Sequence, residues 1–198
     1  MLPVKFESVL NDLKVKMNLD LSVQSDDELS VKSNEVEWSK GPAYSLIPFG
    51  LELSGIKPSS VSNVEPKSKK NCYRYLSSSG VLLEVIIYGS SSAIIEKEIY
   101  FSEGDSKFAV RYDLDGEAVR ASVLVSHNGM PCIGCRLEDD GEYWCYEYKF
   151  QGDELSSMLV YATNSVPGTE IFLSYDDNCL SGLYFYNGAV RVPIYENI

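Results

Sequence analysis

The sequence has few of the features that identify catalytic or membrane proteins. Its 198 residues include one histidine and five cysteines. Its apolar runs fall well short of the roughly 20 residues that a transmembrane helix needs. The start, Met1-Leu-Pro-Val-Lys-Phe-Glu, has no basic segment followed by an apolar one, so we expect no secretory signal and a cytoplasmic location. An odd number of cysteines in such a protein predicts reduced thiols.

Positive charge is scarce in the second half of the chain. Residues 101–198 carry 16 acidic and 6 basic side chains, a balance of −10, whereas residues 1–100 carry 13 and 11, a balance of −2. So acidic a protein is not expected to bind nucleic acid, and a basic protein is the more natural partner. The alternative is that the acidity only keeps a tyrosine-rich protein soluble.

Short strands separated by turn residues account for most of the sequence after residue 71. Fourteen tyrosines and frequent alternation of apolar and polar residues favour strands. Asn-Gly and Asp-Gly pairs separate many of them, which is typical of tight hairpins. The expected strands are 72–76, 81–88, 94–101, 107–112, 117–125, 132–138, 142–150, 154–162, 169–175, 180–186 and 189–195. We therefore predict a mainly β fold, an antiparallel meander of repeated hairpins in one large twisted or curled sheet.

The region before residue 72 has a different pattern. Residues 3–17 place five apolar side chains at helical spacing, which predicts an N-terminal α-helix that packs on the sheet: Phe6, Val9, Leu10, Leu13 and Met17. Period-two alternation at 19–31 suggests a hairpin, which Val36 and Trp38 extend. Pro48 and Gly50 indicate an edge strand or an ordered loop at 44–53.

Three segments organise the chain. Residues 1–53 are too short of core to fold alone, so we expect them to pack on the main sheet. Residues 54–71 are rich in Ser, Pro and Lys and form a polar linker. Residues 72–198 form the β-meander domain.

The most aromatic strand covers residues 143–150. Trp144, Tyr146, Tyr148 and Phe150 alternate along it and therefore share one face. A buried face shared along the meander is the preferred interpretation, and an exposed aromatic binding platform is the alternative.

Four tyrosines each precede a polar turn, which is followed by apolar residues about three apart: Tyr75, Tyr112, Tyr148 and Tyr175. One hairpin cannot bury its apolar face alone, whereas a row of hairpins can share one continuous face. The spacing of the tyrosines is therefore that of stacked hairpin units.

These units resemble the YD repeat of bacterial Rhs and related polymorphic-toxin proteins. Tyr112-Asp113 with Gly116 fits the repeat best, Tyr175-Asp176 keeps its dipeptide, and the likeness covers residues 71–188. Four copies are too few to enclose a toxin. The resemblance implies instead a small hairpin-rich protein, as several acidic cytoplasmic immunity proteins of polymorphic toxins are.

Acidic hairpin tips are the candidate partner-binding sites, because exposed charge beside aromatic side chains is what protein interfaces use. The candidates are Glu138, Asp139, Asp140, Glu142, Tyr143, Asp176 and Asp177.

The one metal candidate is a zinc set of His127, Cys132, Cys135 and Cys145. Cys132 and Cys135 have the two-residue gap of a zinc knuckle. An extended strand would place them on opposite faces, however, and His127 stands before a predicted Asn-Gly turn. We therefore favour partly buried reduced thiols and a solvated histidine, and we expect no cofactor.

The sequence predicts a non-enzymatic binding protein, specifically an immunity protein that covers the active site of a toxin. A structural, adaptor or chaperone module that uses an open sheet edge for strand addition is the alternative. A hydrolase with a carboxylate pair is the second alternative, and the absence of a nucleophile–base pair in the sequence ranks it last.

Overall fold

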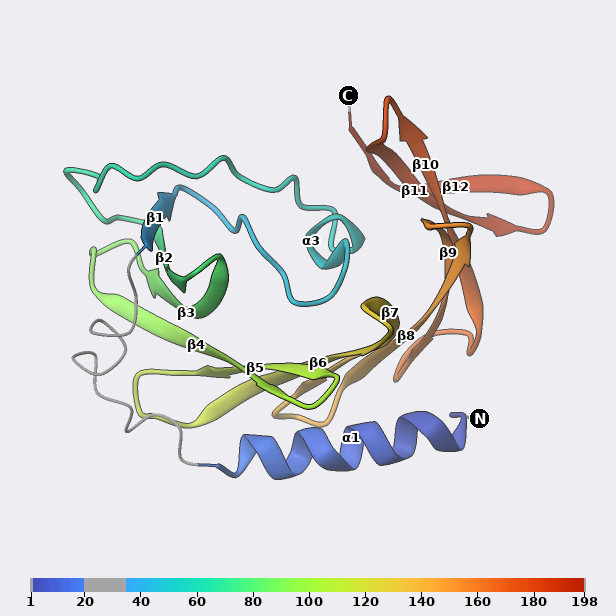
Figure 1. The fold of residues 1–198 in the computed structure, drawn as a ribbon, viewed down its shortest axis with the longest axis horizontal. Helices are drawn as coiled ribbons and strands as arrows, with labels where there is room; N and C mark the ends of the chain where they lie inside the picture. Colours follow the sequence, from blue (N-terminus) through green and yellow to red (C-terminus); the bar gives the residue numbers. More distant parts are fainter. Residues whose placement is uncertain (1, 20–34, 198) are drawn as a thin grey trace.

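The computed structural model describes residues 2–19 and 35–197. Its described strands form one open antiparallel sheet in which each strand pairs with the next one along the chain, and this order confirms the predicted meander (Figure 1). The strands are β1 (Glu35–Ser39), β2 (Tyr73–Ser78), β3 (Val81–Tyr88), β4 (Ile94–Glu103), β5 (Ser106–Tyr112), β6 (Ala118–His127), β7 (Met130–Glu138), β8 (Tyr143–Gln151), β9 (Glu154–Ala162), β10 (Thr169–Asp176), β11 (Cys179–Asn187) and β12 (Val190–Glu196). The hairpin expected at 19–31 lies almost entirely outside the described residues.

Local turn chemistry sets the strand boundaries. All eleven strands expected after residue 71 are present, with ends within two residues of the expected positions. The β6–β7 turn shows why: Asn128 and Gly129 both have positive φ, at 52° and 79°, as a type I′ turn requires. Bulges, such as the one between Val125 and Ser126, interrupt several strand pairs and increase the local twist. The sheet accordingly curls, as Figure 1 shows.

Helix α1 (Val4–Met17) covers one face of the sheet and crosses its central strands (Figure 1). Phe6 and Leu13 are fully buried in the cluster between the helix and strands β4–β8. At the end of the helix, Lys16 Nζ contacts the two carboxylate oxygens of Glu103 at 2.6 and 2.7 Å. The periodicity at residues 3–17 therefore identified both the helix and its buried side.

The opposite, concave face is partly covered by the segment 42–56, which includes the short helix α3 (Gly50–Leu53) (Figure 1). The hydroxyl of Tyr75 holds this segment: it accepts a hydrogen bond from Ala43 N at 2.9 Å and lies 3.0 Å from Ser39 Oγ. Ile47 is buried in the core of the concave face. Of the two alternatives for residues 44–53, the edge strand is wrong and the ordered loop is observed at 44–49, while residues 50–53 form helix α3, which was not predicted.

The aromatic stripe of β8 belongs to this concave core, which confirms the buried-face interpretation. Tyr146 and Tyr148 are buried, and Trp144 is half-buried with the guanidinium of Arg136 4.2 Å from its ring centre. Of the four repeated tyrosines, Tyr112 packs against α1 on the other face of the sheet. Its hydroxyl donates to the carbonyl oxygen of Leu19, because β5 presents this position to the helix side.

Both edges of the open sheet are protected. β12 contains Pro193, which cannot donate a ladder hydrogen bond. At the other edge, the β1 residue Trp38 exchanges two backbone hydrogen bonds with Ser62 of the linker, at 2.8 and 2.9 Å.

Candidate functional site

The β5–β6 and β7–β8 turns lie side by side at one end of the sheet. Asp139 N donates to the carbonyl oxygen of Val119 at 3.1 Å, which joins the second turn to the strand that leaves the first. Together the turns carry six carboxylates, which we call the acidic rim: Asp113, Asp115, Glu117, Asp139, Asp140 and Glu142. The acidic half of the chain thus concentrates charge at one place.

Hydrogen bonds within the turns fix the rim. Asp113 Oδ1 accepts from the backbone N–H groups of Asp115 and Glu117, each at 2.9 Å, and Asp140 Oδ1 accepts from Glu142 N at 2.9 Å. These are side-chain caps of tight turns. Leu114, between Asp113 and Asp115 in the β5–β6 turn, is 69% exposed, so an apolar side chain stands beside carboxylates of the rim.

The structure separates the remaining predicted partner-binding residues from this rim. In a meander, successive turns alternate between the two ends of the sheet, so Asp176 and Asp177 in the β10–β11 turn lie at the end opposite the rim. Glu138 faces inward and contacts Arg120 and Arg136. Tyr143 packs against the α1 cluster.

The zinc candidates are not assembled into a metal site. Among residues 2–19 and 35–197, no group of three or more His, Cys, Asp or Glu side chains could hold a metal ion. Cys135 and Cys145 are opposite each other on β7 and β8, fully buried, with Sγ atoms 2.9 Å apart. The hydrogen bond to Cys145 and burial both raise the pKa of the Cys135 thiol. His127 is exposed at the end of β6.

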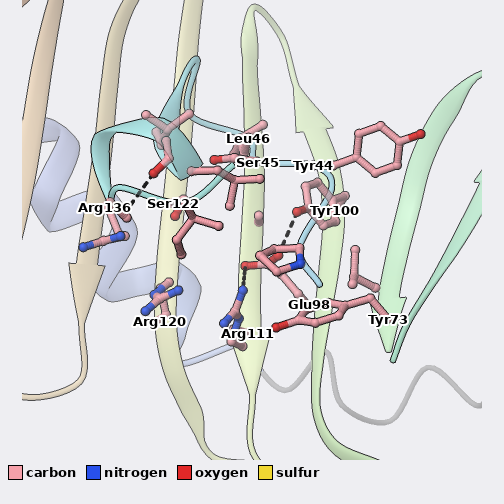
Figure 2. A pocket seen from close by; sticks show the side chains of 18 of the residues that line it. Tyr44, Ser45, Leu46, Tyr73, Glu98, Tyr100, Arg111, Arg120, Ser122 and Arg136 are labelled. Atoms are coloured by element: carbon pink, nitrogen blue, oxygen red, sulfur yellow. Dashed lines mark hydrogen bonds and ion pairs between the residues drawn. The ribbon is translucent and has the colours of Figure 1, made fainter. Parts of the chain in front are cut away.

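A cavity of about 250 Å³ lies on the concave face, between strands β2–β8 and the 42–56 segment. Arg111, Arg120 and Arg136 project into it from β5, β6 and β7, and Figure 2 shows them on neighbouring strands beneath Ser45 and Leu46. Arg111 and Arg120 are direct cross-strand partners. Two like charges in this position destabilise a sheet unless other groups compensate them.

Three glutamates compensate the arginines. Arg111 Nη1 lies 3.3 Å from Glu96 and its Nη2 3.4 Å from Glu98. Arg120 Nε donates to both oxygens of Glu138, at 2.9 and 3.0 Å. Arg136 Nε lies 3.0 Å from Glu138 Oε1 at an angle unsuited to a hydrogen bond. Of these glutamates, only Glu98 lines the cavity.

Burial and neighbouring charge shift the pKa values of the ionisable groups in the cavity. Burial lowers the pKa of Arg136, and the nearby charge of Arg120 lowers it further. Tyr100 donates to Glu98 at 2.7 Å, and burial followed by the Glu98 charge raises the pKa of this tyrosine. For Arg111, burial opposes ionisation, but the carboxylates of Glu98 and Glu96 outweigh it, so the pKa of the guanidinium is raised.

This cavity was not predicted from the sequence. Arg111, Arg120 and Arg136 alternate with apolar residues on their strands, and this pattern normally indicates a solvent-facing side chain. One feature of the sequence could have indicated the site: three of the five arginines of the chain lie on three consecutive strands. The arginines line a cavity because the 42–56 segment, which is distant in sequence, lies above them.

Comparisons with known proteins place the chain in no family. No family model matches it, and a search of curated proteins returns no match. None of the described helices is long and apolar enough to cross a membrane.

Proposed function

We propose that this chain is a non-enzymatic binding protein, an immunity protein that neutralises a bacterial toxin by covering the toxin's active site in the cytoplasm. The acidic rim is the observation that carries this proposal. Four of its carboxylates are on exposed residues, Asp115, Glu117, Asp139 and Asp140, and hydrogen bonds within the turns fix the backbone that carries them and the side chains of Asp139 and Asp140. A fixed patch of negative charge raises the encounter rate with a basic protein.

The rim also has the composition of a contact surface. Leu114, which lies between Asp113 and Asp115 in the β5–β6 turn, is exposed and offers an apolar contact beside the carboxylates. Interfaces commonly surround a buried apolar contact with a charged border. In the proposed complex, Leu114 packs against the toxin while the rim pairs with lysine and arginine side chains around the toxin's active site.

The edges of the sheet argue against the adaptor alternative. Strand addition needs an edge with free backbone groups. Pro193 interrupts one edge, and Ser62 pairs with the other. The cavity likewise gives little support to a hydrolase with paired carboxylates, since its lining has three arginines and the single carboxylate of Glu98.

Growth rescue tests this function. The chain and the toxin gene candidates next to its own gene are co-expressed in a bacterium, and survival is measured. We expect rescue by the wild-type chain and a loss of rescue in the Asp139→Asn/Asp140→Asn variant. The Asp176→Asn/Asp177→Asn variant is the matched control, because it removes the same charge at the opposite end of the sheet. The proposal fails if the chain rescues growth from none of the neighbouring toxins and binds none of them.

A further inference from the structure

The cavity on the concave face has a surplus of positive charge inside an acidic protein. Its lining has three guanidinium groups and one carboxylate, a surplus of two positive charges, whereas the chain as a whole has a net charge of −12. Glu96 and Glu138 contact the arginines but are not part of the lining. The cavity therefore presents three guanidinium groups, while two of the three carboxylates that neutralise them lie outside its lining.

Several donors of these guanidinium groups are available to a ligand. Arg120 contacts Glu138 through Nε, and no residue in the described ranges accepts a hydrogen bond from its two Nη groups. The Nε groups of Arg111 and Arg136 are buried, so the donors open to a ligand are the Nη groups of Arg120 and the exposed parts of the other two guanidinium groups.

The arginines are also accessible. The side chains of Arg111, Arg120 and Arg136 are 23%, 29% and 25% exposed, so the cavity is not sealed. Tyrosine rings form much of the remaining wall: Tyr44, Tyr73, Tyr75, Tyr100 and Tyr146. Figure 2 shows Tyr100 directed at Glu98 and Tyr44 at the outer side of the site. The cavity lining thus combines cationic side chains with aromatic side chains.

We propose that this cavity binds a small organic phosphate monoester. The phosphate group carries a charge of about −1.5 to −2 at neutral pH and has three acceptor oxygens, which match the surplus charge and the three guanidinium groups. Its organic part packs against the tyrosine rings. The volume of about 250 Å³ limits the ligand to a small molecule. This site is separate from the acidic rim, so the proposal does not depend on the immunity function.

Calorimetric titration with phenyl phosphate, inorganic phosphate and malonate tests the proposal. We expect phenyl phosphate to bind most tightly, inorganic phosphate more weakly, and the dicarboxylate malonate least. The Arg136→Gln variant should weaken phenyl phosphate binding about tenfold or more, the effect of losing one charged hydrogen-bonding partner. Arg74→Gln is the matched control, because Arg74 lies on the other face of β2, 5.8 Å from the Trp38 ring centre.

A second variant changes affinity in the opposite direction. Glu98→Gln removes the carboxylate of the cavity lining and should tighten phenyl phosphate binding, and this gain cannot come from misfolding. Chemical shifts of the arginine Nε–H groups locate the ligand, and those of Arg111 and Arg136 should move in wild-type protein. Absence of phosphate binding at millimolar concentration would overturn the proposal. Malonate binding as tight as that of phenyl phosphate, or equal weakening by Arg74→Gln and Arg136→Gln, would overturn it too.

Discussion

Replacement of Phe6 by alanine should loosen helix α1 from the sheet. Phe6 is fully buried, and its ring centre lies 5.1 Å from that of Tyr161. Removal of a buried phenylalanine ring costs about 3–5 kcal/mol, through lost burial and the cavity left behind. A domain of this kind has a total stability of about 5–15 kcal/mol, so the loss is large enough to measure easily.

Urea unfolding measures this loss. The control is Val4→Ala in the same helix, where the side chain is 79% exposed and the free energy of unfolding should change by no more than about 0.5 kcal/mol. If Phe6→Ala lowers the free energy of unfolding by less than about 1 kcal/mol, the packing of α1 on the sheet is refuted.

Thiol labelling distinguishes local detachment of α1 from global unfolding. Cys135 and Cys145 are fully buried in the cluster beneath the helix. In the Phe6→Ala variant, their alkylation, followed by mass spectrometry without denaturant, should accelerate more than that of Cys72, which is buried in a different cluster. Equal acceleration at all three thiols would show that the variant unfolds as a whole and would contradict local detachment.

Two further changes probe the concave face. Burial raises the pKa of Tyr146 to about 12. An unfolded tyrosine ionises near pH 10, so between these values the unfolded state binds fewer protons and stability falls as pH rises. Between about pH 8 and pH 11, the free energy of unfolding should therefore fall by about 1.4 kcal/mol less in the Tyr146→Phe variant than in wild type, as measured by urea unfolding. An equal fall in both proteins would contradict the burial of this hydroxyl. Gly134→Ala would place a Cβ 2.5 Å from the Tyr148 hydroxyl and should cost about 1–3 kcal/mol. The cost should shrink in a Tyr148→Phe background, and an unchanged cost would exclude this contact as its cause.

Local signals predicted most of the fold. The strands after residue 71 follow from alternation and from turn residues such as Asn128 and Gly129, whose positive φ closes a hairpin with no help from distant groups. The helix at 4–17 follows in the same way from the spacing of Phe6 and Leu13. Each of these signals acts over a few residues, and so it can be read from sequence.

The cavity depends on contacts between distant residues, and the sequence did not predict it. The segment above it is held by the Tyr75 hydroxyl, which is 32 residues from Ala43, and by Ile47, which packs over Gly134. No periodicity specifies such a pairing. The acidic rim was predicted in part: the candidates included the β7–β8 turn but not the carboxylates of the β5–β6 turn, because the adjacency of the two turns arises from the sheet order.

The association rate constant between the chain and a toxin that it neutralises in the growth assay tests the proposed function most directly. Stopped-flow measurements over a range of salt concentrations would compare wild type with the two paired variants, Asp139→Asn/Asp140→Asn and Asp176→Asn/Asp177→Asn. We predict that the wild-type rate constant falls steeply with salt and that the rim variant associates about tenfold more slowly at low salt. The Asp176/Asp177 variant should match wild type. A rate constant independent of salt, or equal slowing in both variants, would contradict a role for the acidic rim in capturing the toxin.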